Sequence, residues 1–250
     1  MPETQKSRRP QSVLTLTPTG VLKVLGGFVA VLIIASSLGQ VVRFTMETGR
    51  RHGIVHLFYV GGEANIPTWY SATALFICAM LLALVASVKW RERDRYRHHW
   101  SILAAAFVYL SCDEAAQLHE TGIEWLRAML SNTRLEHVRW VVPATLVVVI
   151  FAAGYLRFLF SLPRKTARHF IMAGMLYVGG AVGLESLVIW RDLRYGGKSP
   201  GHVALTTLEE LSEMAGVVLL IYALLHYLAA ECDVVIGLGT RARDTRNGQT

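Results

Sequence analysis

Apolar residues gather in six blocks of about twenty in this 250-residue chain, and no other feature constrains its fold as strongly. A helix of that length crosses a hydrocarbon core about 30 Å thick. Because lipid offers no partners to backbone N–H and C=O groups, a spanning segment must be a helix or a strand of a closed barrel. Barrel strands alternate polar and apolar residues over roughly 10 positions, and the blocks show no such alternation. The sequence therefore predicts an all-α, polytopic membrane protein.

The six blocks define one transmembrane domain over residues 1–250, predicted as a six-helix bundle. The third block is the weakest, because Asp113 and Glu114 interrupt it. After it, residues 121–137 are predicted to form an interfacial helix. A cleaved signal peptide is an alternative interpretation of the first block, which follows a basic stretch. The predicted spans are 21–42, 68–88, 100–118, 139–160, 170–190 and 206–229.

The distribution of basic residues predicts the orientation of these spans. With the N-terminus inside, the inner segments hold sixteen of the 25 Lys and Arg residues, and the outer segments hold the other nine. Lys and Arg collect on the cytoplasmic side of membrane proteins, so both termini are predicted to lie in the cytoplasm. The net charge of +7 then reflects topology rather than a nucleic-acid partner. We expect a multi-pass protein of the inner (cytoplasmic) membrane with flexible cytoplasmic tails at 1–19 and 235–250.

The acidic residues of the predicted spans are confined to one half of the membrane. At about 1.5 Å rise per residue, these side chains fall in a slab near the outer surface, and the inner halves of the spans contain none. An embedded carboxylate costs at least about 2.5 kcal/mol, so such a placement indicates function. The members of this slab are Asp113, Glu114, His119, Glu120, Glu185, Glu209, Glu210 and Glu213, with Glu63 and Asn65 at its mouth.

Helical spacing predicts that several of these side chains share a face. Asp113 and Glu120 are seven residues apart, and Glu209 and Glu213 are four apart, so each pair lies on one side of its helix. His119 points about 120° away from the Asp113 face at 3.6 residues per turn. It joins the acids only if the helix loosens near it. Carboxylates gathered in this way cannot all stay ionised without compensation, so they must share protons or bind cations.

The first functional hypothesis is a divalent metal site, with Fe, Mn or Zn as candidate ions. Helix bundles build such sites from inward-facing carboxylates and histidines, although the Glu-x-x-His signature of ferritin-like di-iron proteins is absent. The metal would serve a membrane hydrolase or oxidoreductase that acts on a lipid-soluble substrate. The predicted metal ligands are Asp113, His119, Glu120, Glu185, Glu210 and Glu213. The predicted catalytic groups are Glu114 and Glu209, and the residues predicted at the mouth of the substrate pocket are Glu63 and Asn65.

Two other hypotheses remain open. A proton- or cation-coupled carrier also uses carboxylates in membrane helices, although the internal repeats typical of transporters are not evident in the sequence. Alternatively, the acids form structural ion pairs in a non-catalytic subunit of a membrane complex or in a homo-oligomer. The basic residues available for such pairs are Arg139, Arg191, Arg194 and Lys198. Membrane lipids are expected partners in every case.

Glycine and aromatic residues have simpler interpretations. Small residues allow close helix packing in membranes, and this is predicted for Gly174, Gly179, Gly180 and Gly183. Aromatic residues collect at the two membrane–water interfaces, and this is predicted for Trp69, Tyr70, Trp100, Trp125, Trp140 and Trp190.

Two short stretches resemble motifs of intramembrane hydrolases. The segment EELSE at 209–213 resembles the glutamate pair of CAAX-type intramembrane proteases, but the arginine expected after that pair and a second His motif are absent. The series Glu63, Ser71 and Asp113 is loosely similar to alkaline ceramidases, whose three histidines have no counterpart at the corresponding positions. Neither resemblance identifies a family.

Overall fold

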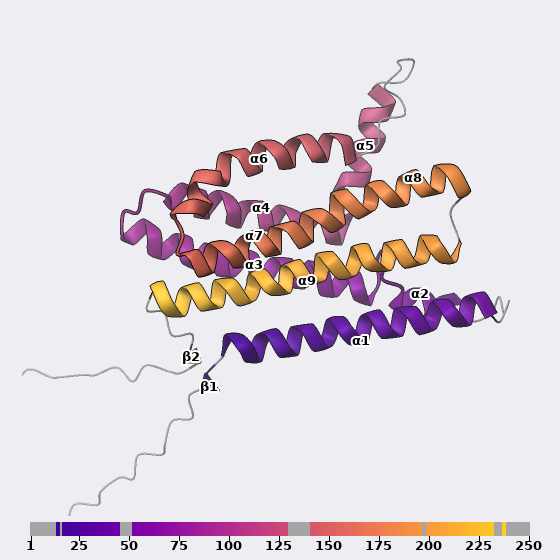
Figure 1. The fold of residues 1–250 in the computed structure, drawn as a ribbon, viewed down its shortest axis with the longest axis horizontal. Helices are drawn as coiled ribbons and strands as arrows, with labels where there is room; N and C mark the ends of the chain where they lie inside the picture. The colour runs from indigo at the N-terminus through magenta and orange to yellow at the C-terminus, as the bar shows by residue number, and fades with distance from the viewer. Residues whose placement is uncertain are drawn as a thin grey trace, which may run out of the picture.

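A computed structural model of the protein describes residues 14–15, 17–45, 52–129, 141–196, 199–232 and 237–238. Within these residues the chain is almost entirely helical (Figure 1), which confirms the predicted all-α class. The helices are α1 (Pro18–Thr45), α2 (His52–Phe58), α3 (Ile66–Arg91), α4 (Arg97–Ala116), α5 (Leu118–Met129), α6 (Val141–Ser161), α7 (Arg164–Val178), the π-helical turn η1 (Gly179–Leu184), α8 (Glu185–Tyr195) and α9 (Pro200–Glu231).

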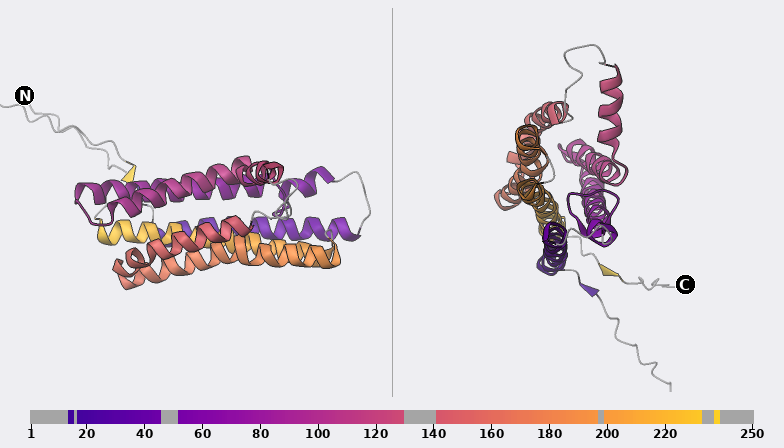
Figure 2. Two further views of the ribbon diagram at one scale, coloured as in Figure 1. Left: turned by 90° about the horizontal axis from the view of Figure 1, so that it is seen from above. Right: turned by 90° about the vertical axis from the view of Figure 1, so that its right-hand side faces the viewer.

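The long helices run alternately up and down and form two layers (Figure 2). One layer holds α1, α9, the continuous α7–η1–α8 rod and α6 side by side. The other layer holds α3 and α4, which pack along each other. Helix α9 is central, since it contacts α1, α3 and α7. Helix α5 leaves the bundle at the end of α4 (Figure 1).

Five of the described helical segments are long and apolar enough to cross a membrane: α1, α3, α6, α7–η1–α8 and α9. Helix α4, which corresponds to the predicted third span, is not among them. It has 20 residues, so its length suffices. Its hydropathy is lowered by His98 and His99 at one end and by Asp113 and Glu114 at the other. The sequence likewise indicates that the third predicted span is the least hydrophobic, because Asp113 and Glu114 interrupt it.

A side-chain cap fixes the start of α3. Asn65 Oδ1 accepts a hydrogen bond from the backbone N–H of Thr68 at 3.1 Å, and its Nδ2 donates to the carbonyl oxygen of Tyr59 at 2.7 Å. Asn65 is buried. The side chain predicted to border a pocket mouth thus holds the α2–α3 loop against the helix that follows.

An aromatic core closes the end of the bundle where α4 begins and α9 ends. Trp100 of α4 is 1% exposed and packs edge-on against Phe158 of α6, with ring centroids 4.9 Å apart. It also contacts Phe170 of α7 and Tyr227 of α9. The assignment of Trp100 to an interfacial belt is therefore wrong. The same correction applies to Tyr70, which is buried, with its hydroxyl hydrogen-bonded to the backbone of α1.

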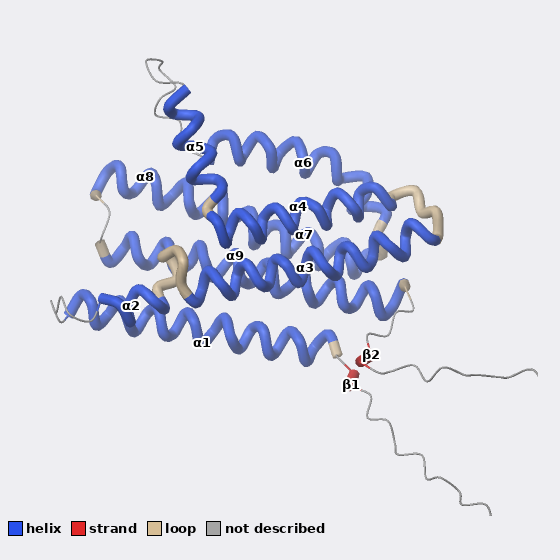
Figure 3. Tube along the Cα trace, turned by 180° about the vertical axis from the view of Figure 1, so that it is seen from behind, coloured by secondary structure: helices blue, strands red, loops and turns tan. Residues whose placement is uncertain are grey.

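The first residue of α1 and the last residue of α9 lie at the same end of the bundle (Figure 3). Beyond them, the two-residue strands β1 (Leu14–Thr15) and β2 (Gly237–Leu238) pair antiparallel. Most of the predicted flexible tails, 1–19 and 235–250, lies outside the described residues.

Replacing Trp100 with Ala is expected to destabilise the bundle by about 3–5 kcal/mol, because it opens a cavity among four helices. The midpoint of thermal unfolding in detergent measures this effect. Trp69→Ala is the matched control, since Trp69 is 69% exposed. Equal losses in the two variants would contradict the central role of Trp100.

Candidate functional site

The helix that carries Asp113 breaks at Gln117. Gln117 has φ 55° and ψ 42°, the left-handed conformation that commonly ends helices. Helix α4 therefore stops, and α5 starts in a new direction (Figure 1). The prediction that Asp113 and Glu120 share one continuous helical face is wrong. The left-handed backbone of Gln117 changes the direction of the chain, so Glu120 lies on a separate helix, α5.

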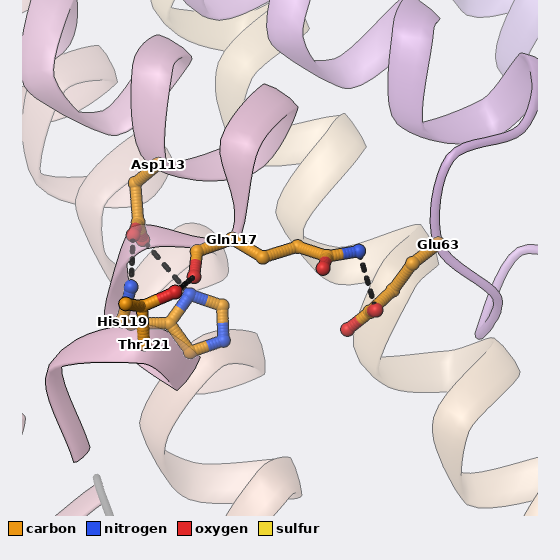
Figure 4. Close-up of polar contacts among 5 residues, drawn as sticks. All are labelled: Glu63, Asp113, Gln117, His119 and Thr121. Carbon is orange, nitrogen blue, oxygen red and sulfur yellow. Dashed lines mark hydrogen bonds and ion pairs between the residues drawn. The ribbon is translucent and has the colours of Figure 1, made fainter. Parts of the chain in front are cut away.

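The break brings His119 to Asp113 (Figure 4). The backbone N–H of His119 donates to Asp113 Oδ1 at 2.6 Å, and the His119 Nδ1 atom lies 3.1 Å from Asp113 Oδ2. The hydrogen bond with Asp113 raises the pKa of the His119 imidazole. The sequence predicts that His119 joins the acids only if the helix loosens near it. The break at Gln117 meets this condition.

Glu63 lies across from the break, in the loop between α2 and α3. The side-chain amide of Gln117 donates to the Glu63 carboxyl (Figure 4), and the carboxyl of Glu120 is hydrogen-bonded to the same group. Partial burial raises the pKa of Glu63, and the neighbouring Glu120 raises it further. An ionised carboxylate only accepts hydrogen bonds, so a hydrogen bond between two carboxyls needs a proton on one of them.

A second set of carboxyls lies between α4, α8 and α9. The Glu209 carboxyl is hydrogen-bonded to that of Glu185, and Glu209 is itself buried. The charges that act on Glu213 are those of Glu114, Glu185, Glu209 and Glu210. Acids of three helices therefore lie within electrostatic range of one another.

Glu114, near the end of α4, connects the two sets. On one side, the charges that act on it are those of Asp113, His119 and Glu63. On the other side, Glu114 itself acts on Glu210. The acids from the α2–α3 loop to α9 thus form a continuous electrostatic series.

Close packing of η1 on α9 positions this second set. A Cβ added at Gly180 would lie 2.7 Å from Glu213 Cγ and 2.9 Å from the carbonyl oxygen of Glu209, so only glycine fits there. The π-helical turn stands directly before Glu185 and shifts the register of the residues that follow it. Open space within 4 Å surrounds the Cβ positions of the other predicted packing residues, Gly174, Gly179 and Gly183.

The two arginines of α8 have other neighbours. Arg191 Nη1 lies 3.7 Å from Asp192 Oδ1, and Asp192 Oδ2 lies 3.0 Å from His202 Nδ1. Arg194 stacks over the ring of Trp190. Among the residues that the structure describes, no Lys or Arg forms an ion pair with Glu114, Glu209, Glu210 or Glu213. The other predicted partners, Arg139 and Lys198, lie outside the described residues.

The described residues do not by themselves assemble the predicted metal centre. Within the described ranges, no group of three His, Cys, Asp or Glu side chains is placed to hold a metal ion. Two carboxyls that hydrogen-bond to each other also present fewer lone pairs to a cation. No chemical step is therefore assigned to a metal.

Residues 25–228 match the family described as Domain of unknown function (DUF8692), from α1 to the last turns of α9. The chain belongs to this DUF8692 family. The matched region includes every acid considered above, from Glu63 to Glu213. No curated protein and no solved structure matches the chain.

Two polar side chains of this DUF8692 protein, Tyr177 and Asp192, have roles that the sequence predictions do not include. The charges of Glu213 and Glu114 act on Tyr177 of α7. Asp192 bridges Arg191 and His202 at the outer end of α8 and α9. Tyr177 stands eight residues before Glu185, about two helical turns, and that spacing was the available signal.

Asp113→Asn is expected to lower the pKa of His119 towards its ordinary value, because the charge-assisted hydrogen bond is lost. In the wild type the pKa is raised. The stability that the pair contributes is therefore complete below about pH 6.5 and is lost as the pH rises through the folded-state value. An NMR titration of labelled histidine measures both pKa values.

Glu124→Gln is the control for this titration, because it removes an exposed carboxyl from the same helix, α5. An unchanged His119 pKa in Asp113→Asn would show that the contact does not form in solution.

Proposed function

We propose that this protein is a six-span membrane protein whose outward-facing carboxyls bind and exchange protons, as a proton-coupled carrier requires. The observation that supports the proposal is the pair of carboxyl–carboxyl contacts, Glu185 with Glu209 and Glu63 with Glu120. Each contact needs a proton. Carboxyls in membrane helices commonly serve as proton relays.

Neutralisation by protons accounts for the surroundings of the acids better than structural ion pairs do. Arg191 Nη1 lies 3.7 Å from Asp192 Oδ1, and Arg194 stacks over the ring of Trp190. Several ionised carboxylates in a medium of low dielectric constant repel one another strongly. Among the described residues, no Lys or Arg pairs with Glu114, Glu209, Glu210 or Glu213, so α4 and α9 stay packed at this level only if most of these four groups carry protons or bind cations.

The order of the groups suggests a route for the proton. His119, held by Asp113, receives a proton at the mouth, and Glu114 passes it towards Glu210 and Glu213. The core around Trp100 closes the opposite half of the bundle. In this arrangement the carboxyls exchange protons with the outer side alone, and transfer to the inner side requires the helices to move.

Infrared spectroscopy of the purified protein tests the proposal. The wild type is expected to show the carbonyl stretch of protonated carboxyls at neutral pH, and Glu209→Gln is expected to lose part of it. Glu231→Gln, on the exposed last residue of α9, is the control and is expected to keep the full band. A wild-type protein without this band would refute proton storage.

Divalent metal binding, with Fe, Mn or Zn, remains a competing proposal for the same carboxyls. In that case Glu114 and Glu209 would be the catalytic groups of an enzyme that acts on a lipid-soluble substrate. Elemental analysis of the wild type beside Glu213→Gln and Asp113→Asn distinguishes the two. Stoichiometric metal that both variants lose would favour the metal, whereas metal-free protein with pH-dependent uptake into liposomes would favour the carrier.

The proposed topology places both termini in the cytoplasm and makes α4 a true crossing despite its acids. Reporter fusions after Arg93, in the α3–α4 turn, and after Gly196, in the α8–α9 turn, are expected to be cytoplasmic and external respectively. The Lys and Arg bias sets this direction. The same side for both fusions would contradict the six-span topology.

A further inference from the structure

A cationic surface lies where α7 begins and α9 ends, at the opposite end of the bundle from the acids. Lys165 Nζ of α7 lies 3.1 Å from His226 Nε2 of α9, so the ammonium donates to the imidazole. His169 lies one turn further along α7, and its ring packs edge-on against Tyr222 of α9 with centroids 5.4 Å apart. Both Lys165 and Arg168 are exposed. We call these five residues the α7–α9 basic face.

The α7–α9 basic face carries positive charge without an acidic partner. The charges that act on His169 come from Arg168, Lys165 and His226, all of them basic. Across the described segments, neither Lys165 nor Arg168 forms an ion pair with a carboxylate. The first turn of α7 also has no acidic residue and no side-chain cap, so its backbone N–H groups add to the positive potential.

The basic run at the α3–α4 turn, residues 89–97, differs because several of its side chains have partners. Lys89 pairs with Glu92 at 2.7 Å. Asp94 accepts from the backbone N–H of Tyr96 at 2.6 Å, and Arg97 stacks over the ring of Trp90. Lys89, Arg95 and Arg97 of this run are thus engaged by an acid or an aromatic ring. This contrast makes the α7–α9 basic face the better anion-binding candidate.

Apolar side chains continue the α7–α9 basic face towards the middle of the bundle. Lys165, His169 and Met172 follow one another at helical spacing along α7, and His226, Tyr222 and Leu219 do so in the opposite direction along α9. Met172 is 42% exposed, and Leu219 and Tyr222 are partly exposed. The surface therefore grades from cationic to apolar along the bundle axis.

We propose that the α7–α9 basic face binds an anionic phospholipid. The phosphate headgroup accepts hydrogen bonds from the exposed Lys165 and Arg168, and an acyl chain lies along Met172 and Leu219. Basic surfaces between membrane helices near one interface recognise anionic headgroups in this way. The graded polarity selects a lipid over free phosphate, because free phosphate gains nothing from the apolar part. This inference does not rest on the proposed proton binding.

Native mass spectrometry of the full-length protein, released from mixed phosphatidylglycerol and phosphatidylcholine vesicles, tests this site. The wild type is expected to retain phosphatidylglycerol in preference. Lys165→Ala with Arg168→Ala is expected to reduce that retention about fivefold or more for each charge removed, which corresponds to about 1 kcal/mol each. Lys165→Arg is expected to preserve it.

The control removes two exposed charges from the same end of the bundle, Lys23→Ala with Arg91→Ala. This double variant is expected to retain the lipid as the wild type does, and unfolding midpoints confirm that both doubles are folded. Equal losses in the two double variants would overturn the site. Displacement of the lipid by millimolar inorganic phosphate alone, or equal retention of phosphatidylcholine, would also overturn it.

Discussion

The burial of several carboxyl groups at one end of the bundle is the constraint on which that end depends, because no described Lys or Arg pairs with Glu114, Glu209, Glu210 or Glu213. Glu209 is buried and shares a hydrogen bond with Glu185, and their neighbours on α4 and α9 add further negative charge. In a medium of low dielectric constant such groups cannot all be ionised. The packing of the helices around these carboxyls therefore depends on the protons or cations that neutralise them.

The two halves of the bundle are built on different physical principles. The end where α4 begins is held by dispersion and apolar burial around Trp100, Phe158 and Phe170, interactions that do not depend on pH. The opposite end contains the buried carboxyls, and both irregularities of the long helices, η1 and the break at Gln117, lie next to them. A change in the protonation of these carboxyls would therefore act on their end of the bundle and leave the core around Trp100 in place.

Prediction from the sequence succeeded where one property of a segment decides the outcome. The apolar blocks gave the long helices with ends within a few residues, because lipid forces the backbone to satisfy its own hydrogen bonds. Prediction failed for Trp100 and for three of the four glycines, because residue type alone does not say which neighbour a helix face meets. Gly216 illustrates the same limit: its added Cβ would lie 2.7 Å from the backbone nitrogen of Tyr177, and nothing local marked it.

The sequence by itself determined the long apolar helices and the position of the acids towards one end of them, since segment length, hydropathy and position along a helix are properties of the chain alone. Only the tertiary structure decided which acids touch. The left-handed Gln117 brought His119 to Asp113 and separated Glu120 from their helix. The glycine crossing at Gly180 and the π-helical turn set Glu185 against Glu209. Such contacts depend on backbone conformations of single residues and on the approach of distant helices, which periodicity does not encode.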